Sequence, residues 1–191
     1  MAFSFNGTNQ RLSTAVAPVT AAPWTVNLWF KTSNMTQVKP LLTLYAGAVD
    51  YASIYFRGDQ TGDPIQILNQ AGAGQFSVVS TSGCTSGVWH NACYVESSST
   101  NRTIYLDGGN SATNTTSAVY SGLSSLNIGA YFTSEIFDGQ IAEVGIWNAV
   151  LTAEEIAHKL KLTAPDRFEA LSRRLGAMQR DGQVLVNRRG G

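Results

Sequence analysis

The sequence predicts an all-β protein, built as a sandwich of two antiparallel sheets and followed by a C-terminal helical and extended tail. The first observation is a series of roughly a dozen short strand-like segments, at intervals of about ten residues, which is the spacing typical of a sandwich. The second is the composition: of 191 residues, 14% are charged, 43% are hydrophobic and 18 are glycine. Such a chain can bury a full core and still form many turns.

The strands are predicted from alternating apolar residues between turns. Trp24–Thr32 is the clearest, because its large apolar residues fall at every second position and so share one face. The turn Asn6-Gly7 predicts a hairpin between Ala2–Phe5 and Gln10–Thr14. The other predicted strands are, in order, Leu41–Ala46, Tyr51–Arg57, Ile65–Gln70, Phe76–Ser80, Val88–Glu96, Arg102–Leu106, the weaker edge strand Ser111–Val119, Ser125–Phe132 and Phe137–Trp147.

A short helix is predicted after the last strand. Thr152 is a suitable N-cap, and Glu155 three residues later completes a capping box. Ala153, Ile156 and Leu160 recur at helical spacing, so one side of this helix is apolar and needs a sheet to lie on. We therefore expect one sandwich domain over residues 1–162, with a C-terminal helix and extended attachment arm over residues 163–191.

The tail differs from the rest of the chain in charge. Residues 1–163 hold 7 basic and 10 acidic residues, a net of −3, whereas residues 164–191 hold 6 arginines and 3 acidic residues, a net of +3. Thr163 and Pro165 predict the start of a second helix that runs to Arg180, followed by a short strand in QVLVN. The predicted anchoring residues of the tail are Arg167, Phe168, Leu171, Arg174, Leu175, Met178, Val184 and Val186.

Two interpretations of the tail remain open at this stage. In one, the second helix packs back on the sandwich and the last residues are frayed. In the other, the tail is an arm that docks on a neighbouring subunit or a larger shell by helix packing and strand addition. Its arginines are interleaved with apolar residues, a pattern that suits an acidic protein surface better than nucleic acid.

The ends and the cysteines indicate the compartment. The first ten residues lack the basic start and apolar run of a secretory signal, and no segment has the roughly 18 apolar residues of a membrane span. We therefore expect a product made in the cytoplasm. Cys84 and Cys93 have no metal-binding spacing and form either a cross-strand disulfide or two free thiols; without an export signal, free thiols are favoured.

Several segments resemble one family. WHNACYVESSSTNRTIYLDGG resembles the paired Trp-His and Tyr-Leu-Asp-Gly strands of laminin-G-like, concanavalin A-like domains, SLNIGAYF their following Ile-Gly strand, and FDGQIAEVGIWNAVLTAEEI their closing strand and helix. FSFNGTNQRLS is similar to their opening Phe-Asp-Gly turn, with Asn6 in place of the usual acid. The resemblance covers Ala2 to Lys161 and implies a two-sheet antiparallel jelly roll. Its members include glycan-binding modules, adhesive domains, and surface proteins of bacteria and viruses.

The resemblance also raises the question of catalysis. Some relatives hydrolyse glycans with several acids close together on one strand. Here the nearest cluster is Glu135, Asp138 and Glu143, whose spacing puts Asp138 on the face opposite the two glutamates, whereas hydrolysis needs two facing carboxylates. No Ser or Cys has a nucleophile motif around it, and His90 is interpreted as a structural residue. The sequence therefore predicts no catalytic residues.

Members of the family often hold a structural calcium ion, which needs six to eight oxygen ligands. Asn6, Asp138 and nearby carbonyls are the candidates, because the first and last strands lie side by side in this fold. The absence of an acid at position 6 weakens this interpretation, and the alternative is that Asn6-Gly7 and Asp138-Gly139 are simply turns. We expect no other cofactor or metal.

A glycan site is a further candidate. Tyr45, Tyr51, Tyr55 and Tyr131 are able to stack on a sugar or a partner, or else to fill and edge a sheet. As a whole, the sequence predicts a non-enzymatic virion surface protein (a capsid decoration or fibre-associated protein) that is located in the virion and held by its tail with the sandwich facing outward. The expected partners are a capsid or other virion protein, further copies of the chain in a homo-oligomer, and a glycan, but no nucleic acid or membrane. The alternatives are a free carbohydrate-binding module and a glycan hydrolase.

Overall fold

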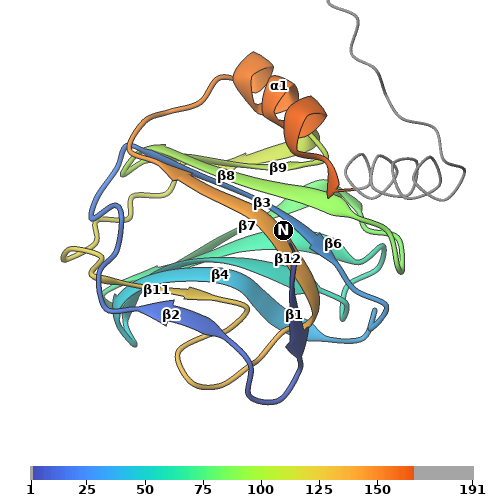
Figure 1. Ribbon diagram of the computed structural model, residues 1–191. Helices are drawn as coiled ribbons and strands as arrows, with labels where there is room; N and C mark the ends of the chain where they lie inside the picture. The colour runs from blue at the N-terminus through green and yellow to red at the C-terminus, as the bar shows by residue number, and fades with distance from the viewer. Residues whose placement is uncertain (1, 166–191) are drawn as a thin grey trace, which may run out of the picture.

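The protein is a sandwich of two antiparallel sheets with one helix on its surface, as the computed structural model, which describes residues 2–165, shows (Figure 1). Sheet A has the strand order β1 (Ala2–Asn6), β12 (Asp138–Trp147), β3 (Trp24–Lys31), β8 (His90–Ser98), β9 (Asn101–Leu106) and β10 (Gly109–Asn114). Sheet B has the order β2 (Leu12–Thr14), β11 (Ser125–Ile128), β4 (Val38–Gly47), β5 (Asp50–Arg57), β6 (Pro64–Ala71) and β7 (Gly74–Gly83). The predicted all-β sandwich is confirmed.

The core lies between the two sheets. Trp24 and its alternate neighbours on β3 are fully buried, as their spacing predicted. They face residues such as Leu44 and Ile54 of sheet B within one continuous apolar cluster. Because side chains alternate along a strand, the residues between them lie on the outer faces of the two sheets. The helix covers the outer face of sheet A, and the candidate site lies on that of sheet B.

One predicted pairing is wrong. The two N-terminal strands do not form a hairpin: β1 pairs with β12 in sheet A, whereas β2 pairs with β11 in sheet B. The side-chain oxygen of Asn6 accepts hydrogen bonds from the backbone N–H groups of Thr8, Asn9 and Gln10. These bonds hold a wider loop, and Gly7 N donates to the carbonyl of Phe137 at 3.0 Å instead of closing a two-residue turn.

Two other predicted strands end early. The weak strand predicted over Ser111–Val119 is the edge strand β10, which ends at Asn114. The strand predicted over Ser125–Phe132 ends at Ile128, because Gly129 has φ = 75° and the chain leaves the sheet there. The loop that follows carries part of the candidate site.

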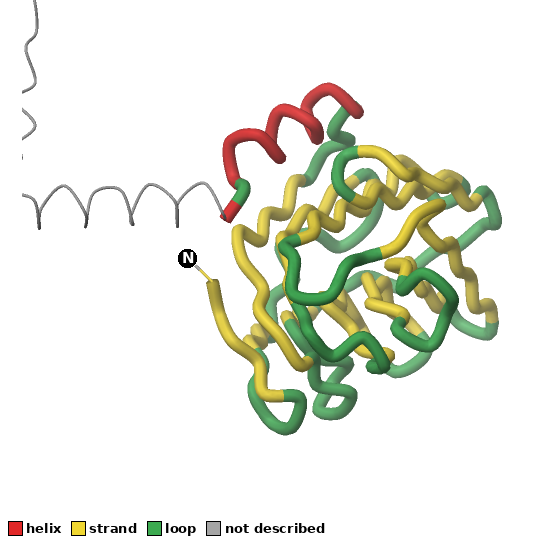
Figure 2. The backbone as a smooth tube through the Cα atoms, turned by 90° about the vertical axis from the view of Figure 1, so that its right-hand side faces the viewer, coloured by secondary structure: helices red, strands yellow, loops and turns green. Residues whose placement is uncertain are grey.

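Helix α1 (Ala153–Thr163) has the predicted capping box: Thr152 Oγ1 accepts from Glu155 N at 3.2 Å, and a Glu155 carboxylate oxygen accepts from Thr152 N at 2.8 Å. The helix lies across the outer face of sheet A (Figures 1 and 2). Its buried Ile156 contacts Cys93 and Val95. In the described part of the chain, no helix is long and apolar enough to cross a membrane.

The start of the tail differs from the prediction. Thr163, expected to cap a second helix, is the last residue of α1, and Ala164 is its C-cap. Ala164 packs with Leu160 against the cluster of Trp29, Trp89 and Ala142. The predicted anchoring residues from Arg167 to Val186 lie outside the described residues.

Candidate functional site

The candidate site lies on the outer face of sheet B. Tyr45 on β4 and Tyr51 on β5 are register partners, and Tyr55 lies four residues further along β5. These three tyrosines alternate with core residues such as Leu44 and Ile54, so their side chains leave the sheet on the side away from the core.

A tight hairpin in the loop between β11 and β12 covers this face. Tyr131 and Ser134 exchange two backbone hydrogen bonds, at 3.2 and 3.0 Å, which leaves Phe132 and Thr133 at the tip of the turn. Phe132 has φ = 51°, and Glu135 just after the hairpin also has φ = 51°. A bulky residue with positive φ is an outlier, and such strain is concentrated at binding and active sites.

The hairpin brings the predicted tyrosines together. The ring of Phe132 lies 4.5 Å from that of Tyr45 and 4.4 Å from that of Tyr131, and Tyr131 lies 5.1 Å from Tyr51. Tyr131 meets Tyr51 and Phe132 edge to face, whereas Phe132 is tilted against Tyr45. We call Tyr45, Tyr51, Tyr55, Tyr131 and Phe132 the aromatic cluster. Phe132 was not predicted, although its place beside Tyr131 in the sequence was a usable signal.

Members of the cluster differ in exposure. Tyr51 and Tyr55 are only 4% and 5% exposed, so they form its base and offer little ring surface. Tyr45, Tyr131 and Phe132 are half-buried and present part of their rings to solvent. The cluster therefore combines a fixed base with an accessible aromatic rim.

Polar groups border the cluster. The Tyr55 hydroxyl donates to a Glu135 carboxylate oxygen at 3.0 Å, and the side-chain amide of Gln75 donates to the Tyr51 hydroxyl at 3.3 Å. Burial raises the pKa of Tyr131 to about 12, and burial beside Glu135 raises the pKa of Tyr55 as well. These hydroxyls therefore keep their protons at neutral pH and remain hydrogen-bond donors.

Arg57, two residues beyond Tyr55 on β5, is already paired. Arg57, at the end of β5, donates to both carboxylate oxygens of Asp59, at 2.8 and 2.7 Å, and also donates to Gln66. This arginine holds the pKa of Asp59 below its usual value. Since Glu135 is exposed and carries the remaining charge of this border, the site presents acceptors and neutral donors rather than a free cation.

The calcium ligands expected from the family already hold hydrogen bonds within the protein. Asn6 and Asp138 are register partners, which confirms that the first and last strands lie side by side. However, the oxygen of Asn6 accepts from three backbone N–H groups, and Asn34 donates to the Asp138 carboxylate at 3.1 Å. Thr32 and Gln37 donate to the Asp138 carbonyl. N–H and O–H donors thus already engage the side-chain oxygen of Asn6, one carboxylate oxygen of Asp138 and its carbonyl, and no group of three His, Cys, Asp or Glu side chains that could hold a metal exists among residues 2–165.

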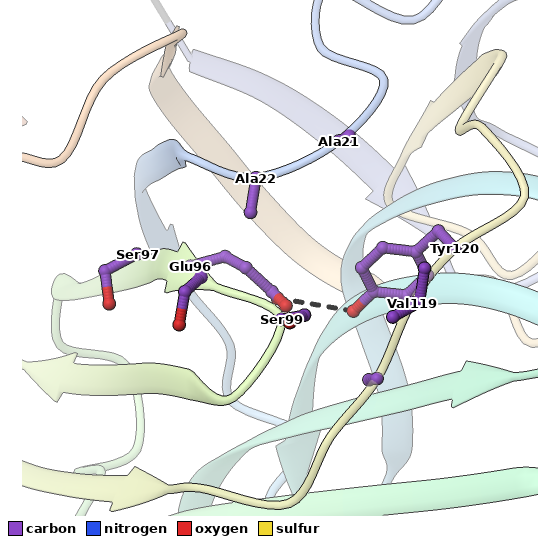
Figure 3. A pocket seen from close by; sticks show the side chains of 9 residues that line it. Ala21, Ala22, Glu96, Ser97, Ser99, Val119 and Tyr120 are labelled. Atoms are coloured by element: carbon purple, nitrogen blue, oxygen red, sulfur yellow. Dashed lines mark hydrogen bonds between the residues drawn. The ribbon is translucent and has the colours of Figure 1, made fainter.

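A pocket at one end of the sandwich holds a buried acid. The pocket has a volume of about 330 Å³, and Figure 3 shows Glu96 reaching across it toward the hydroxyl of Tyr120. Tyr94 and Tyr120 donate to one Glu96 oxygen and Arg102 donates to the other, at 3.2 Å in the case of Arg102. Burial raises the pKa of Glu96. Both of its oxygens are engaged, and Glu96 is the one carboxylate among the described residues that line the pocket, whereas glycan hydrolysis needs two.

The acids of the predicted cluster lie in different settings. Glu135 belongs to the border of the aromatic cluster, Asp138 begins β12 next to Asn34, and Glu143 lies where the register of β12 shifts against β3. The register shift breaks the simple alternation that was used to place Asp138 relative to the glutamates.

His90 and the cysteines have structural surroundings. His90 Nδ1 lies 2.8 Å from an Asp107 oxygen, and its Nε2 accepts from Thr85 N at 2.7 Å. Both cysteines are free, as favoured. Burial raises the pKa of Cys84 to about 12 and that of Cys93 as well, so neither thiol is a ready nucleophile.

Known structures share this fold. A heptameric SAP-like pentraxin from Limulus polyphemus has 16% identity and a TM-score of 0.65, over 82% of this chain and 79% of that chain. Domain 4 of AbnA, a GH43 extracellular arabinanase from Geobacillus stearothermophilus, has 17% identity and a TM-score of 0.68, over 82% of this chain and 75% of that chain. Domains LG4-5 of the mouse laminin alpha1 chain have 15% identity and a TM-score of 0.62, over 80% of this chain and 43% of that chain. At these identities the likeness shows the fold.

No curated protein matches the chain. Residues 6–157 match the Laminin_G_3 family of the concanavalin A-like lectin/glucanases superfamily. The match covers most of the sandwich, including both strands that pair around the aromatic cluster. The protein therefore belongs to the laminin-G-like family of the concanavalin A-like lectin/glucanases superfamily.

Proposed function

We propose that the protein is a non-catalytic carbohydrate-binding module that holds its glycan on the aromatic cluster. The observation that carries the proposal is the Phe132 hairpin, which keeps a bulky residue at φ = 51° and places the half-exposed rings of Phe132 and Tyr131 beside Tyr45 and Tyr51, respectively. Strain of this kind is not needed to close the core, and it supports a role in binding.

The chemistry of the cluster suits a sugar. The exposed parts of Tyr45, Tyr131 and Phe132 offer apolar surface to the C–H face of a pyranose or furanose ring. Gln75 and Glu135 border the cluster at the hydroxyls of Tyr51 and Tyr55, and their amide and carboxylate are groups that can bond sugar hydroxyls. The similar arabinanase domain was solved in complex with arabinotriose, which adds support from a related fold.

The charges at the site favour a neutral glycan. Arg57 is held by Asp59, and Glu135 is exposed beside Tyr55, so an anionic sugar would meet a carboxylate without a free cation nearby. A neutral sugar offers hydroxyl donors to Glu135 and hydroxyl acceptors to the Gln75 amide. We therefore expect neutral glycans to bind better than sialylated or sulfated ones.

A glycan array with matched variants tests the proposal. The wild-type chain is expected to bind neutral glycans at micromolar strength, and the double change Tyr131→Ser with Phe132→Ser is expected to weaken binding at least tenfold. Phe3→Ser is the control, because Phe3 is an exposed aromatic residue on β1 in the other sheet. If no glycan binds, or if both variants bind as the wild type does, the proposal is wrong.

We also propose the more specific role that the sequence suggested, a virion surface protein anchored by residues 166–191. The opposite net charges of residues 1–163 and 164–191 support a tail specialised for attachment. The test compares the full chain with one truncated after Pro165, since Ala164 packs on the sandwich. Light scattering after mixing with purified virions should show association of the full chain alone; equal association of both chains would refute an anchoring tail.

A further inference from the structure

The four sheet edges are not equally protected. At one side of the sandwich, β7 and β10 are the edges of the two sheets, and Asn114 at the end of β10 donates to the carbonyl of Ser77 on β7 at 3.2 Å. The register of β10 is also broken by an irregularity between Gly109 and Ala112. Contact between the sheets and a bulge both prevent another strand from pairing there.

The other side holds the edges β1 and β2. Strand β2 has 3 residues and directly follows Arg11, so it offers a short edge next to a charge. Strand β1 has 5 residues, Ala2–Asn6, without charge, proline or a break in its register with β12. Within the described residues, β1 is therefore the one edge without a device that blocks pairing.

Apolar surface accompanies this free edge. Phe3, in the middle of β1, is 49% exposed, whereas Phe5 on the same face of the strand is 5% exposed and belongs to the core. An added strand would cover the Phe3 ring and extend the core by one position. An exposed edge with a large apolar residue is a template for strand addition.

The tail begins beside this edge. Ala164 packs against the cluster of Trp29, Trp89 and Ala142, and Ala142 is the register partner of Ala2 at the start of β1. The C-terminal end of α1 and the N-terminal end of β1 lie on the same side of the molecule in both views (Figures 1 and 2). The sequence of the tail predicts a second helix up to Arg180 and a strand over Gln183–Asn187, which has the same length as β1.

We propose that the free edge of β1 pairs with residues 183–187 of a second copy of the chain, so that two copies exchange their tails. The predicted helix from residue 166 to Arg180, at about 1.5 Å per residue, would span roughly 22 Å, which is long enough for Val184 to reach a neighbouring copy. Reciprocal exchange around a two-fold axis satisfies both edges with the same contacts. Side chains alternate along the added strand, so one of its two faces lies beside Phe3. That face carries either Leu185 or the pair Val184 and Val186.

The test measures the mass of four chains by light scattering at micromolar concentration. The full chain is expected to be a dimer, and the chain truncated after Pro165 a monomer. Leu185→Pro, which removes a backbone donor and restricts the added strand, and Phe3→Lys, which places a charge on the edge, are each expected to weaken dimerisation at least tenfold. Val16→Lys is the control for added charge, because Val16 is 73% exposed and lies outside every strand.

Hydrogen exchange separates the remaining outcomes. Amide protons of β1 that face away from β12 should exchange more slowly in the full chain than in the truncated chain, and a synthetic peptide of residues 181–191 should restore this protection. A full chain that is monomeric overturns the exchange of tails, even if its own tail protects β1. A dimer that persists in Leu185→Pro overturns the pairing itself. Glycan binding by Phe3→Lys should stay unchanged, so the glycan-binding proposal and the exchange of tails fail independently.

Discussion

The two outer faces of the sandwich are covered in different ways. On sheet A, α1 seals an apolar surface, where Cys93, Val95 and Ile156 are at most 5% exposed. On sheet B, the hairpin of Tyr131 and Phe132 covers polar and aromatic side chains but stays half-exposed itself. Nearly complete burial on the first face stabilises the fold, whereas on the second face a half-exposed hairpin with Phe132 at positive φ indicates a surface kept for a ligand.

The largest expected effect tests the sealed face. Ile156→Ala should lower the free energy of unfolding by about 2–5 kcal/mol, because it leaves a cavity between α1 and sheet A. Urea denaturation measures this loss, and alkylation of Cys93 should become faster as the helix opens more often. Glycan affinity of the folded variant should not change. A parallel loss of affinity would mean that the two faces are coupled.

The next effect tests the open face. Tyr131→Ala should weaken glycan binding by about tenfold, which corresponds to about 1.4 kcal/mol, since it removes one of the exposed rings. Its free energy of unfolding should change less than that of Ile156→Ala, because Tyr131 is only half-buried. Titration calorimetry and denaturation of the same samples compare the two quantities. A loss of stability as large as that of Ile156→Ala would make the cluster part of the core.

A smaller effect is expected at the start of α1. Thr152→Ala removes the oxygen that accepts from Glu155 N and should cost about 1 kcal/mol of stability. The thermal midpoint measures the change, with Thr61→Ala in an exposed turn as the matched control. Equal midpoints for the two variants would show that the capping box does not contribute measurably to the stability of the protein.

The smallest effect concerns the polar border of the site. Gln75→Ala should weaken glycan binding by about two- to fivefold, because the hydrogen bond of an exposed neutral amide contributes ~0.5–1 kcal/mol, the lower part of the usual range. Because the side chain of Gln75 is exposed, the substitution should leave the free energy of unfolding unchanged. Array signals for neutral glycans provide the measurement. Unchanged binding would restrict the site to the rings and Glu135.

Local patterns determined much of the architecture. Alternation in Trp24–Lys31 placed its large residues in the core, and Thr152 with Glu155 placed the start of α1, since both depend on neighbours within a few residues. The same reasoning failed at Asn6-Gly7, where a two-residue hairpin was expected. The Asn6 side chain bonds three backbone donors there, so the next strand joins the other sheet.

The arrangement of the candidate site could not be predicted from the sequence. Four tyrosines were chosen from their type alone, and nothing in the sequence said that residues 45, 51, 55 and 131 would meet. Only the tertiary structure decided this, because cross-strand register and the hairpin after β11 set the distances between residues far apart in the chain. The sequence by itself determined the sandwich, the capped helix and the charged tail; packing decided which tyrosines are base, which are rim, and which sheet edge is left free.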